Sequence, residues 1–436
     1  MKTRRDFIKS LTAAAAMAGT AGAPKFTFAQ EAGGKTFIKV FMRGGADGLH
    51  LFPLYGDNFY YNYRPQLAIA PPNGDSSSAI DLGPAAGGMR GMNPNLALLH
   101  SEIWETGNMM VAPATSFAGA NRSHFDCQRW IGTGARNNLI DGYLNRYMQN
   151  VPGTDHPLRG MVAGKSSIST EIRGEIKVAA VNRGSDYNLV NRDFCSGTDC
   201  ADNRLTEIMR EISSHDVDLT GTEMEIRENQ LVMLDTIAEV QEAGVDYVPN
   251  ADGLQYSNSD LGRGLQLCAQ LLKAGVPLEV AALDWNIGWD THSNQIADNG
   301  DPFTNQDKGY HSRMVRGAND FVTFYRDMGA DMQNIVVLTG SEFGRTKKQN
   351  GSFGTDHGQG GTWFAFGGPT QQAVAADVST IDDTVVDRNW LPTLTSYRNI
   401  VGEIMVRHMG MDQQLISTIF PNHTFEDYSL FRGASA

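Results

Sequence analysis

Short apolar runs alternate with longer segments of helical periodicity along most of this chain. Apolar runs predict β-strands at residues 36–42, 108–113, 175–181, 278–283, 334–338 and 362–366. Helical patterns lie at residues 260–274, 310–328 and 393–409, and a further helix is predicted to begin near Ser123. Strand and helix signals in alternation are typical of an α/β fold with a largely parallel sheet. We therefore expect a central, mostly parallel sheet with helices on both faces.

Two stretches depart from this alternation. Residues 57–95 are rich in Gly, Pro, Asn and Ser, and predict an irregular excursion. Between residues 201 and 245 the pattern becomes purely helical, because apolar residues recur at intervals of three with charged residues between them. The apolar positions are Leu231, Leu234, Ile237 and Val240. Since this stretch lacks candidate ligands, we expect a helical insertion or cap over approximately residues 201–258.

The first 29 residues predict an export signal that lies outside the fold. Arg4 and Arg5 precede Phe, Ile and Lys, a soft apolar run follows at residues 11–23, and Ala29 ends a small-residue cleavage site. This order resembles the twin-arginine signal, whose translocase carries folded proteins. The alternatives are a membrane anchor, for which the run is short and rich in Ala and Gly, or a chance arginine pair. We expect residues 30–436 to form one domain in the periplasm or at the cell exterior.

The charge balance of the 436-residue chain limits its partners. The net charge is −13, and removal of residues 1–29, with five basic residues and one acidic residue, leaves 31 basic and 48 acidic residues, or −17. Nucleic-acid binders carry a basic footprint, so nucleic acid is excluded as a partner. An anionic substrate is not excluded, because a bound metal can be the largest local charge in a site. No other apolar stretch is long enough to cross a membrane.

The four cysteines give no structural zinc site, because none of them forms a CxxC pair. Cys195 and Cys200 flank a polar loop, and an oxidising compartment permits either a disulfide or two free thiols there. Cys268 lies within an apolar helical pattern, which favours a place in the core.

Acidic and histidine residues follow several of the predicted strands. They are Asp47 in RGGADG, Asp290 and His292 in WDTHSNQ, Glu342 in GSEFGRT, and Asp356 and His357 in GTDHG. Ligands in an open α/β sheet bind outside the carboxyl ends of its strands, so the fold can unite these separate segments. Oxygen and imidazole donors favour a divalent metal, Zn²⁺ first, with Mg²⁺, Mn²⁺ or Ca²⁺ as alternatives.

Each of these residues also has a structural interpretation. Asp47 lies between glycines and can satisfy the amides of its own turn. Asp290 can cap a turn while His292 lies on the surface, although in an extended segment both face the same side. Glu342 can form an ion pair with Arg345 that holds the loop. In the GTDHG loop the adjacent Asp and His point differently, so that one can ligate an ion while the other orients it or binds a second ion.

A nucleophile and its helpers are predicted from the remaining polar motifs. Ser123 in NRSHF opens a predicted helix, where backbone N–H groups favour a phosphoryl or sulfuryl anion, but a plain N-cap explains it equally well. His124 adjoins it and can assist, or can simply face solvent. Arg345 can hold an anionic substrate with its bidentate fork. The chain contains neither the G-x-S-x-G motif of serine hydrolases nor a nucleotide-binding glycine motif.

The motifs in combination resemble a known family. RGGADG, NRSHFD, WDTHSNQ, GSEFGRT and GTDHGQGG, in this order behind a twin-arginine leader, are similar to the domain of unknown function 1501 family, placed in the alkaline phosphatase and sulfatase superfamily. The resemblance covers nearly the whole mature chain. It implies an alkaline-phosphatase-like sheet, one or two divalent ions, and a covalent nucleophile in transfer of phosphoryl or sulfuryl groups.

The resemblance assigns roles by position. Asp47 would match the acid after the first strand, and Ser123 the nucleophile at the start of a helix. Asp290 and His292 would match the paired ligands of one ion, and His357 the final histidine ligand.

Two positions depart from the superfamily pattern. Asp290 and His292 lie closer together than the usual acid and histidine. Glu342 stands where an Asp followed by His is usual, and Phe343 follows it instead, which leaves a second ion without a ligand unless Asp356 supplies one. A formylglycine sulfatase is not expected, because the Cys-x-Pro-x-Arg signature is missing.

Two functions from different classes remain open from the sequence. The first is an exported metal-dependent hydrolase of phosphate or sulfate esters, acting on an anionic small-molecule or glycan ester with a serine nucleophile. The alternative is a non-catalytic envelope binding protein that retains the fold and binds an anionic glycan or a partner protein in the same cleft.

Overall fold

The computed structural model of the chain describes residues 34–136, 139–184, 208–211, 213, 222–244, 247–296, 310–375 and 378–433. The predicted export signal, together with Cys195 and Cys200, lies outside the described residues. The two cysteines that are described, Cys127 and Cys268, are both buried free thiols. Cys268 is therefore a core residue, as its helical pattern predicted.

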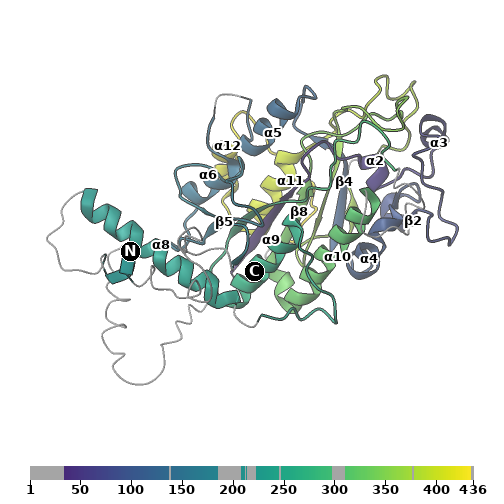
Figure 1. Cartoon of the computed structure of the whole chain (residues 1–436). Helices are drawn as coiled ribbons and strands as arrows, with labels where there is room; N and C mark the ends of the chain where they lie inside the picture. Colours follow the sequence, from purple (N-terminus) through teal and green to yellow (C-terminus); the bar gives the residue numbers. More distant parts are fainter. Residues whose placement is uncertain are drawn as a thin grey trace.

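A nine-stranded sheet forms the centre of the molecule (Figure 1). Its order is β10-β4-β9-β8-β1-β7-β5-β6, and β11 also pairs with β4. The strands are β1 (Thr36–Phe41), β4 (Met109–Ser116), β5 (Gly160–Ala163), β6 (Ala179–Val181), β7 (Val280–Asp284), β8 (Ile335–Gly340), β9 (Gly361–Phe366), β10 (Ala373–Val374) and β11 (Thr395–Ser396). Only β9 runs antiparallel to its neighbours, β4 and β8. The predicted α/β fold with a mostly parallel central sheet is confirmed.

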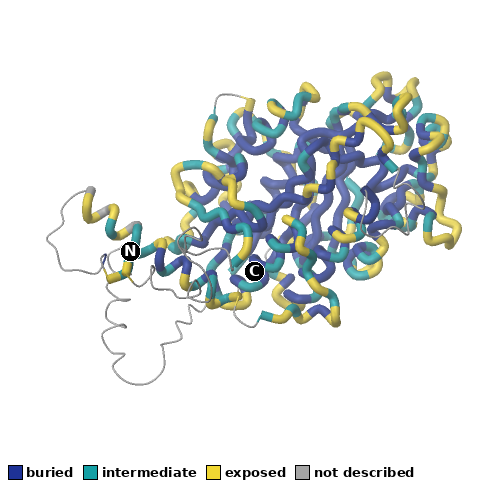
Figure 2. The backbone as a smooth tube through the Cα atoms, in the orientation of Figure 1, coloured by how far each residue is buried: buried dark blue, intermediate teal, exposed yellow. Residues whose placement is uncertain are grey.

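Helical layers cover both faces of the sheet, and Figure 2 shows the buried backbone between them. In β1, Ile38 and Val40 point into one core and Phe37 and Phe41 into the other, because successive side chains of a strand face opposite sides. Helices of the first layer are α4 (Ala97–Leu99), α9 (Asp260–Lys273) and α10 (Tyr310–Met328). Helices of the second are α5 (His124–Thr133), α6 (Tyr143–Asn150), α11 (Tyr397–Glu403) and α12 (Ile416–Ile419).

Smaller elements fill the segment predicted to be irregular. It holds α3 (Asn58–Tyr63), a hairpin of β2 (Ile80–Asp81) and β3 (Gly91–Met92), and the 3₁₀ turns η1 (Gly83–Ala86) and η2 (Pro94–Leu96). Further short elements are α2 (Gly48–Leu51), η3 (His100–Trp104), η7 (Gly329–Asn334), η8 (Ile404–His408) and η9 (Gln413–Leu415).

Helix α8 (Thr222–Gly244) lies within the segment expected to be a helical insertion, and Figure 1 shows it extending away from the sheet. The part of α8 that contacts α9 buries Leu234, Ile237 and Val240. Within the described part of the chain, no helix is both long and apolar enough to cross a bilayer.

The register of the central strands brings the loops that follow them to one edge of the sheet. Phe41, the last residue of β1, pairs with Asp284 of β7 on one side and with Gly340 of β8 on the other. Since the three strands are parallel, the loops that begin at residues 42, 285 and 341 leave the sheet side by side. These loops carry most of the predicted metal ligands.

Candidate metal centre

Close backbone contact joins the loops after β1 and β7. Gly44 has a φ of +125°, and a Cβ atom built there would lie 2.8 Å from the backbone nitrogen of Asp290. Only glycine fits such an approach at such a φ. The amide of Gly44 also donates to Glu342 in the loop after β8, over 2.9 Å. One residue therefore ties all three loops together.

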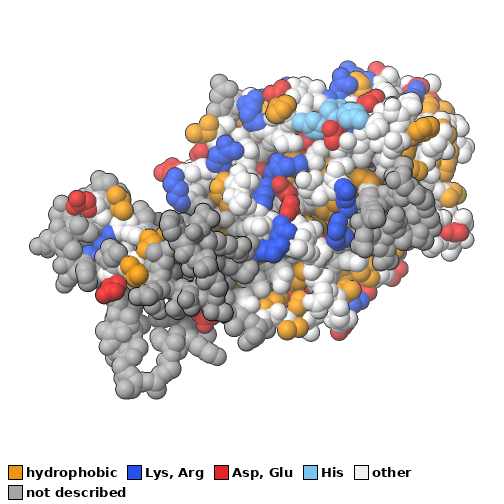
Figure 3. Space-filling model, viewed as in Figure 1, with side chains coloured by type: hydrophobic (Ala, Val, Ile, Leu, Met, Phe, Trp, Pro, Cys, Tyr) orange, Lys and Arg blue, Asp and Glu red, His pale blue; other side chains and the backbone are white. Residues whose placement is uncertain are grey.

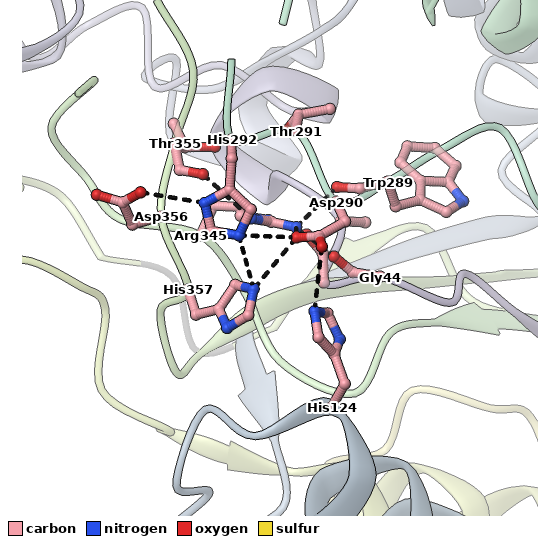
Figure 4. Close-up of polar contacts among 12 residues, drawn as sticks. Gly44, His124, Trp289, Asp290, Thr291, His292, Arg345, Thr355, Asp356 and His357 are labelled. Carbon is pink, nitrogen blue, oxygen red and sulfur yellow. Dashed lines mark hydrogen bonds and ion pairs between the residues drawn. The ribbon is translucent and has the colours of Figure 1, made fainter. Parts of the chain in front are cut away.

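Three imidazole nitrogens and one carboxylate converge in front of these loops (Figure 4). Nε2 of His292 and Nε2 of His357 each lie 3.1 Å from Oδ1 of Asp290, and 3.0 Å from each other. Nε2 of His124, at the start of α5, lies 3.4 Å from Oδ2 of Asp290. That nitrogen is buried and has no hydrogen-bond partner among the described residues. Figure 3 shows histidine side chains gathered at the surface beside acidic ones.

The second nitrogen of each ring faces an acceptor. Nδ1 of His124 donates to Glu342 over 2.8 Å, and Nδ1 of His292 donates to Asp356 over 3.1 Å. Nδ1 of His357 donates to the backbone carbonyl of Arg122 over 2.9 Å. In a neutral imidazole the other nitrogen then carries a lone pair. All three lone pairs therefore belong to Nε2 atoms that point into the same space.

Glu342 is fully buried and serves as the anchor behind His124. Its carboxylate accepts hydrogen bonds from the Gly44 amide, from Nε2 of Gln128 and from Oγ of Ser341, in addition to His124. Burial acts to raise the pKa of Glu342, but the hydrogen bonds from His124 and Gln128 outweigh it and hold the pKa below its usual value. The same hydrogen bond raises the pKa of His124.

Arg345 holds Asp290 and the surrounding backbone. Its buried guanidinium donates to Oδ1 of Asp290 and to the carbonyl oxygens of Gly44, Gly45, Trp289 and Thr355. Burial acts to raise the pKa of Asp290, but the hydrogen bond and charge of Arg345, together with His357 and His292, outweigh it and lower the pKa to about 2. The carboxylate is thus charged and fixed in direction. Because the guanidinium is occupied in this way, Arg345 is placed to position Asp290 rather than to contact a substrate.

The start of α5 carries the other predicted catalytic residues. Ser123 is the N-cap, and its Oγ accepts a hydrogen bond from the amide of Asp126 over 3.4 Å. Arg122 before it adopts a φ of +67°, which is uncommon for a residue other than glycine. This conformation accompanies the contact between its carbonyl and His357, so the local backbone strain lies beside the group of histidines.

Asp47 occupies a different environment. Its two carboxylate oxygens accept hydrogen bonds from Arg64, which is completely buried, and from Gln295. Burial acts to raise the pKa of Asp47, but the charge and hydrogen bonds of Arg64, together with His50 and Gln295, outweigh it and lower the pKa. Gln295 in turn accepts from Thr291 and Thr355, next to Asp290 and Asp356. Asp47 therefore stabilises, through Gln295, the loops that carry Asp290 and Asp356.

The chain also matches a known protein family. Residues 106–418 match the family described as Protein of unknown function (DUF1501). The chain belongs to this family. The match includes α5 and the loops that carry Asp290, Glu342 and His357, and it confirms the family resemblance predicted from the motifs.

Solved structures give distant matches to this DUF1501 chain. The alkaline phosphatase from the Antarctic bacterium TAB5 is 10% identical with a TM-score of 0.29, over 78% of this chain and 94% of that one. A mutant of the TAB5 enzyme with Mg bound in the M3 site is 12% identical, also with a TM-score of 0.29, over 78% and 93%. No protein with a curated description matches the chain.

Several of the separations between donor atoms in this DUF1501 chain suit one small divalent ion. An ion held tetrahedrally at about 2.0–2.1 Å keeps its ligand atoms about 3.3 Å apart. The separations of 3.0, 3.1 and 3.4 Å found here bracket that value. Among the described residues, the ligand atoms of His124, Asp290 and His357 all lie within 4.8 Å of one another and form a group able to hold a metal. His292 lies outside this group but contacts Asp290 and His357.

The predicted site residues thus fall into two groups, those that face the shared centre and those that hold the first group or its loops in place. Asp290, His292 and His357 face it, as does His124, which the sequence suggested only as a helper of Ser123. Glu342 and Asp356 stand behind histidines, and Arg345 and Asp47 hold the loops. Neither Gln128 nor the Arg122 carbonyl was predicted as a support, because no motif marks a distant partner and the positive φ of Arg122 is a property of the folded chain.

Proposed function

We propose that this chain is an exported, metal-dependent hydrolase of phosphate or sulfate esters. The observation that carries the proposal is the convergence of three Nε2 atoms on Asp290, with each Nδ1 held by an acceptor. Metal-binding histidines in proteins are oriented in this way, by a carboxylate or a backbone carbonyl at the second nitrogen. In the proposal His124, Asp290, His292 and His357 hold the ion, which is Zn²⁺ or another divalent metal.

The centre is reachable from solvent, as catalysis requires. The side chains of His292 and Asp290 are 46% and 47% exposed, whereas Glu342 and Arg345 behind them are buried. The solvent-accessible side chains of the centre therefore lie in front of buried residues that support it. A divalent metal bound there supplies a Lewis acid that stabilises the charge developing on a phosphoryl or sulfuryl oxygen.

Ser123 is the proposed nucleophile. It immediately precedes His124, at the N-terminus of α5, where backbone N–H groups and the helix dipole favour an anion. Its contact with the Asp126 amide is long, so the hydroxyl is only weakly engaged. Oγ would bond to phosphorus or sulfur as the alcohol leaves, with the hydroxyl proton passing to solvent and the alcohol taking one from it. Water then cleaves the seryl ester and restores the hydroxyl. The nitrogens of His124 are committed to Glu342 and to the ion.

Chelation tests the function directly. We expect full-length purified protein to hydrolyse 4-nitrophenyl phosphate or 4-nitrophenyl sulfate, to lose this activity with a chelator, and to regain it with Zn²⁺ or Mn²⁺. His357→Ala should lose at least 100-fold in kcat/KM, and His100→Ala, a histidine that contacts Asp81 instead, should lose none. Bound metal without turnover of a broad ester panel would favour the binding protein instead.

A trapping experiment tests Ser123 separately. Rapid acid quench with labelled substrate should leave the label on Ser123. Ser123→Asn retains an N-cap, so the helix start is preserved while the nucleophile is removed, and the label should disappear. Full activity of Ser123→Asn would indicate that water rather than the serine is the attacking group, and it would not contradict the proposed metal site.

A further inference from the structure

The guanidinium of Arg122 is exposed and lies over the ring of Trp390, 4.1 Å from its centroid. Among the described residues it makes no hydrogen bond and no ion pair. Stacking uses the flat face of the guanidinium and leaves the N–H groups at its edge free to donate. Two of these N–H groups can bind a carboxylate, phosphate or sulfate by parallel hydrogen bonds. Within the described part of the chain, Arg122 is thus a cation held on an aromatic ring, and its donors meet no acceptor there.

The same residue is attached to the candidate metal centre. Its carbonyl accepts from Nδ1 of His357, the nitrogen on the opposite side of the ring from the shared centre. Trp390, on which the guanidinium lies, pairs with Thr346, and the amide of Thr346 donates to the carbonyl of Asp356. The backbone of Arg122 thus contacts His357, and the ring on which its guanidinium lies is joined through Thr346 to Asp356.

Arg122 precedes the proposed nucleophile Ser123, and its carbonyl faces Nδ1 of His357 rather than Nε2. A phosphoryl or sulfuryl group in reaction contacts the Nε2 side of His357, whereas the backbone of Arg122 lies on the Nδ1 side. A substrate that extends past His357 meets the guanidinium with another part of its structure. In a chain with a net charge of −13, a cation without an acidic partner beside the centre also favours an anionic group locally.

We propose that Arg122 binds a second anionic group of the substrate, so that the site selects esters whose alcohol part carries a carboxylate, phosphate or sulfate of its own. This inference rests on the proposed function, whose substrate class it narrows. Arg122 is a specificity-determining residue here, and the reaction itself does not use it.

Paired substrates test this. Phenyl phosphate and 4-carboxyphenyl phosphate, or the corresponding sulfates, differ only in the second charge. The wild type should prefer the carboxylated ester. Arg122→Asn tolerates a positive φ and should raise the KM of that ester about tenfold, or about 1.4 kcal/mol. The kcat, the metal content and the KM of the ester without the carboxylate should change less than twofold. Arg173→Asn, at an exposed arginine that contacts Thr170, is the control and should change neither KM.

Two outcomes would overturn the inference. They are an equal loss on both esters, which would place Arg122 on the reacting group, and a wild type without preference. If the wild type hydrolyses neither ester, the proposed function fails, and Arg122 is then tested by calorimetry with phenylphosphonate and 4-carboxyphenylphosphonate on the metal-loaded protein. Tighter binding of the carboxylated compound that is lost in Arg122→Asn upholds the second anion site, and equal binding refutes it.

Discussion

Nε2 of His292 and Nε2 of His357 lie 3.0 Å apart, although Nδ1 of each ring already donates to an acceptor. Two neutral rings in this arrangement direct lone pairs at each other, which is repulsive unless a cation lies between them. Burial lowers the pKa of His357, which disfavours a proton as that cation. A metal ion, with Asp290 and His124 as further ligands, resolves the arrangement.

Glu342 should control metal affinity without touching the metal. Its charge and hydrogen bond fix the His124 ring, so Glu342→Gln should weaken metal binding by about 10–100-fold, as loss of such a supporting carboxylate usually does. Competition with a chromophoric chelator measures the change. Glu102→Gln, which removes the charge from a partly exposed pair with Arg326, is the matched control and should leave the affinity unaltered. Unchanged affinity in Glu342→Gln would mean that His124 is not a ligand.

Gly44 should be intolerant of even a methyl group. A Cβ there meets the Asp290 backbone at 2.8 Å and its φ of +125° disfavours any side chain. We expect Gly44→Ala to lower stability by about 2 kcal/mol and to weaken metal binding, because the loops after β1 and β7 must separate. Urea unfolding with and without Zn²⁺ measures both effects. Gly351→Ala is the control, since nothing lies within 4 Å of a Cβ at that position and its φ is not positive. Equal behaviour of the two variants would contradict the account of the loop contact.

Acid should destabilise the protein through buried neutral histidines away from the centre. Burial lowers the pKa of His408 from 6.5 to about 4, and its ring donates to the carbonyl of Thr36. Because the unfolded chain takes up this proton near pH 6.5 and the folded chain only near pH 4, stability falls as pH decreases between these values. His408→Gln keeps a donor but does not titrate, so it should abolish about 2–3 kcal/mol of the fall. Parallel pH dependence of unfolding in wild type and variant would show that His408 is not responsible.

Export should depend on the arginine pair at the N-terminus. Replacing Arg4 and Arg5 with Lys should leave folded, metal-loaded precursor in the cytoplasm, because the twin-arginine route transports proteins after folding. Folding around the ion before export also avoids competition from copper, which the order of metal affinities favours. Cell fractionation and metal analysis of the precursor measure both. Normal delivery of the variant to the periplasm would refute the targeting signal and leave the metal site untouched.

The sequence predicted those parts of the fold that have strong periodicity. Helix α10 was predicted with the bounds that it has, Tyr310–Met328, because its apolar face repeats over five turns. Strand β5 was missed, since four residues are too few for a pattern, and α6 was missed because its eight residues span little more than two turns. Of the strand expected at residues 175–181, only β6 at its end forms. The helix expected at residues 393–409 begins at Tyr397 instead, and it continues as η8.

For the site, the sequence predicted which loops contribute residues, but not which side chains face the shared centre and which support them. The predicted residues that follow β1, β7 and β8, or that open α5, do lie near one edge, since parallel strands bring their ends together. Asp356 and His357 instead precede β9. Whether an acid faces the ion or stands behind a histidine depends on side-chain direction, which a motif does not contain. Glu342 and Asp356 illustrate this, because each is within hydrogen-bond distance of a ring rather than of the shared centre. Asp47 is committed to Arg64, a partner seventeen residues away that the motif could not reveal.

Anomalous diffraction from crystals of the zinc-loaded protein tests the central claim most directly. Data collected on both sides of the zinc edge should show one peak within about 2.0–2.2 Å of the Nε2 atoms of His124, His292 and His357 and of a carboxylate oxygen of Asp290. The same crystals should keep Glu342 on Nδ1 of His124, at a distance from the peak. A peak bound by Asp47 or Glu342 instead, or no peak among the three histidines, would contradict the account.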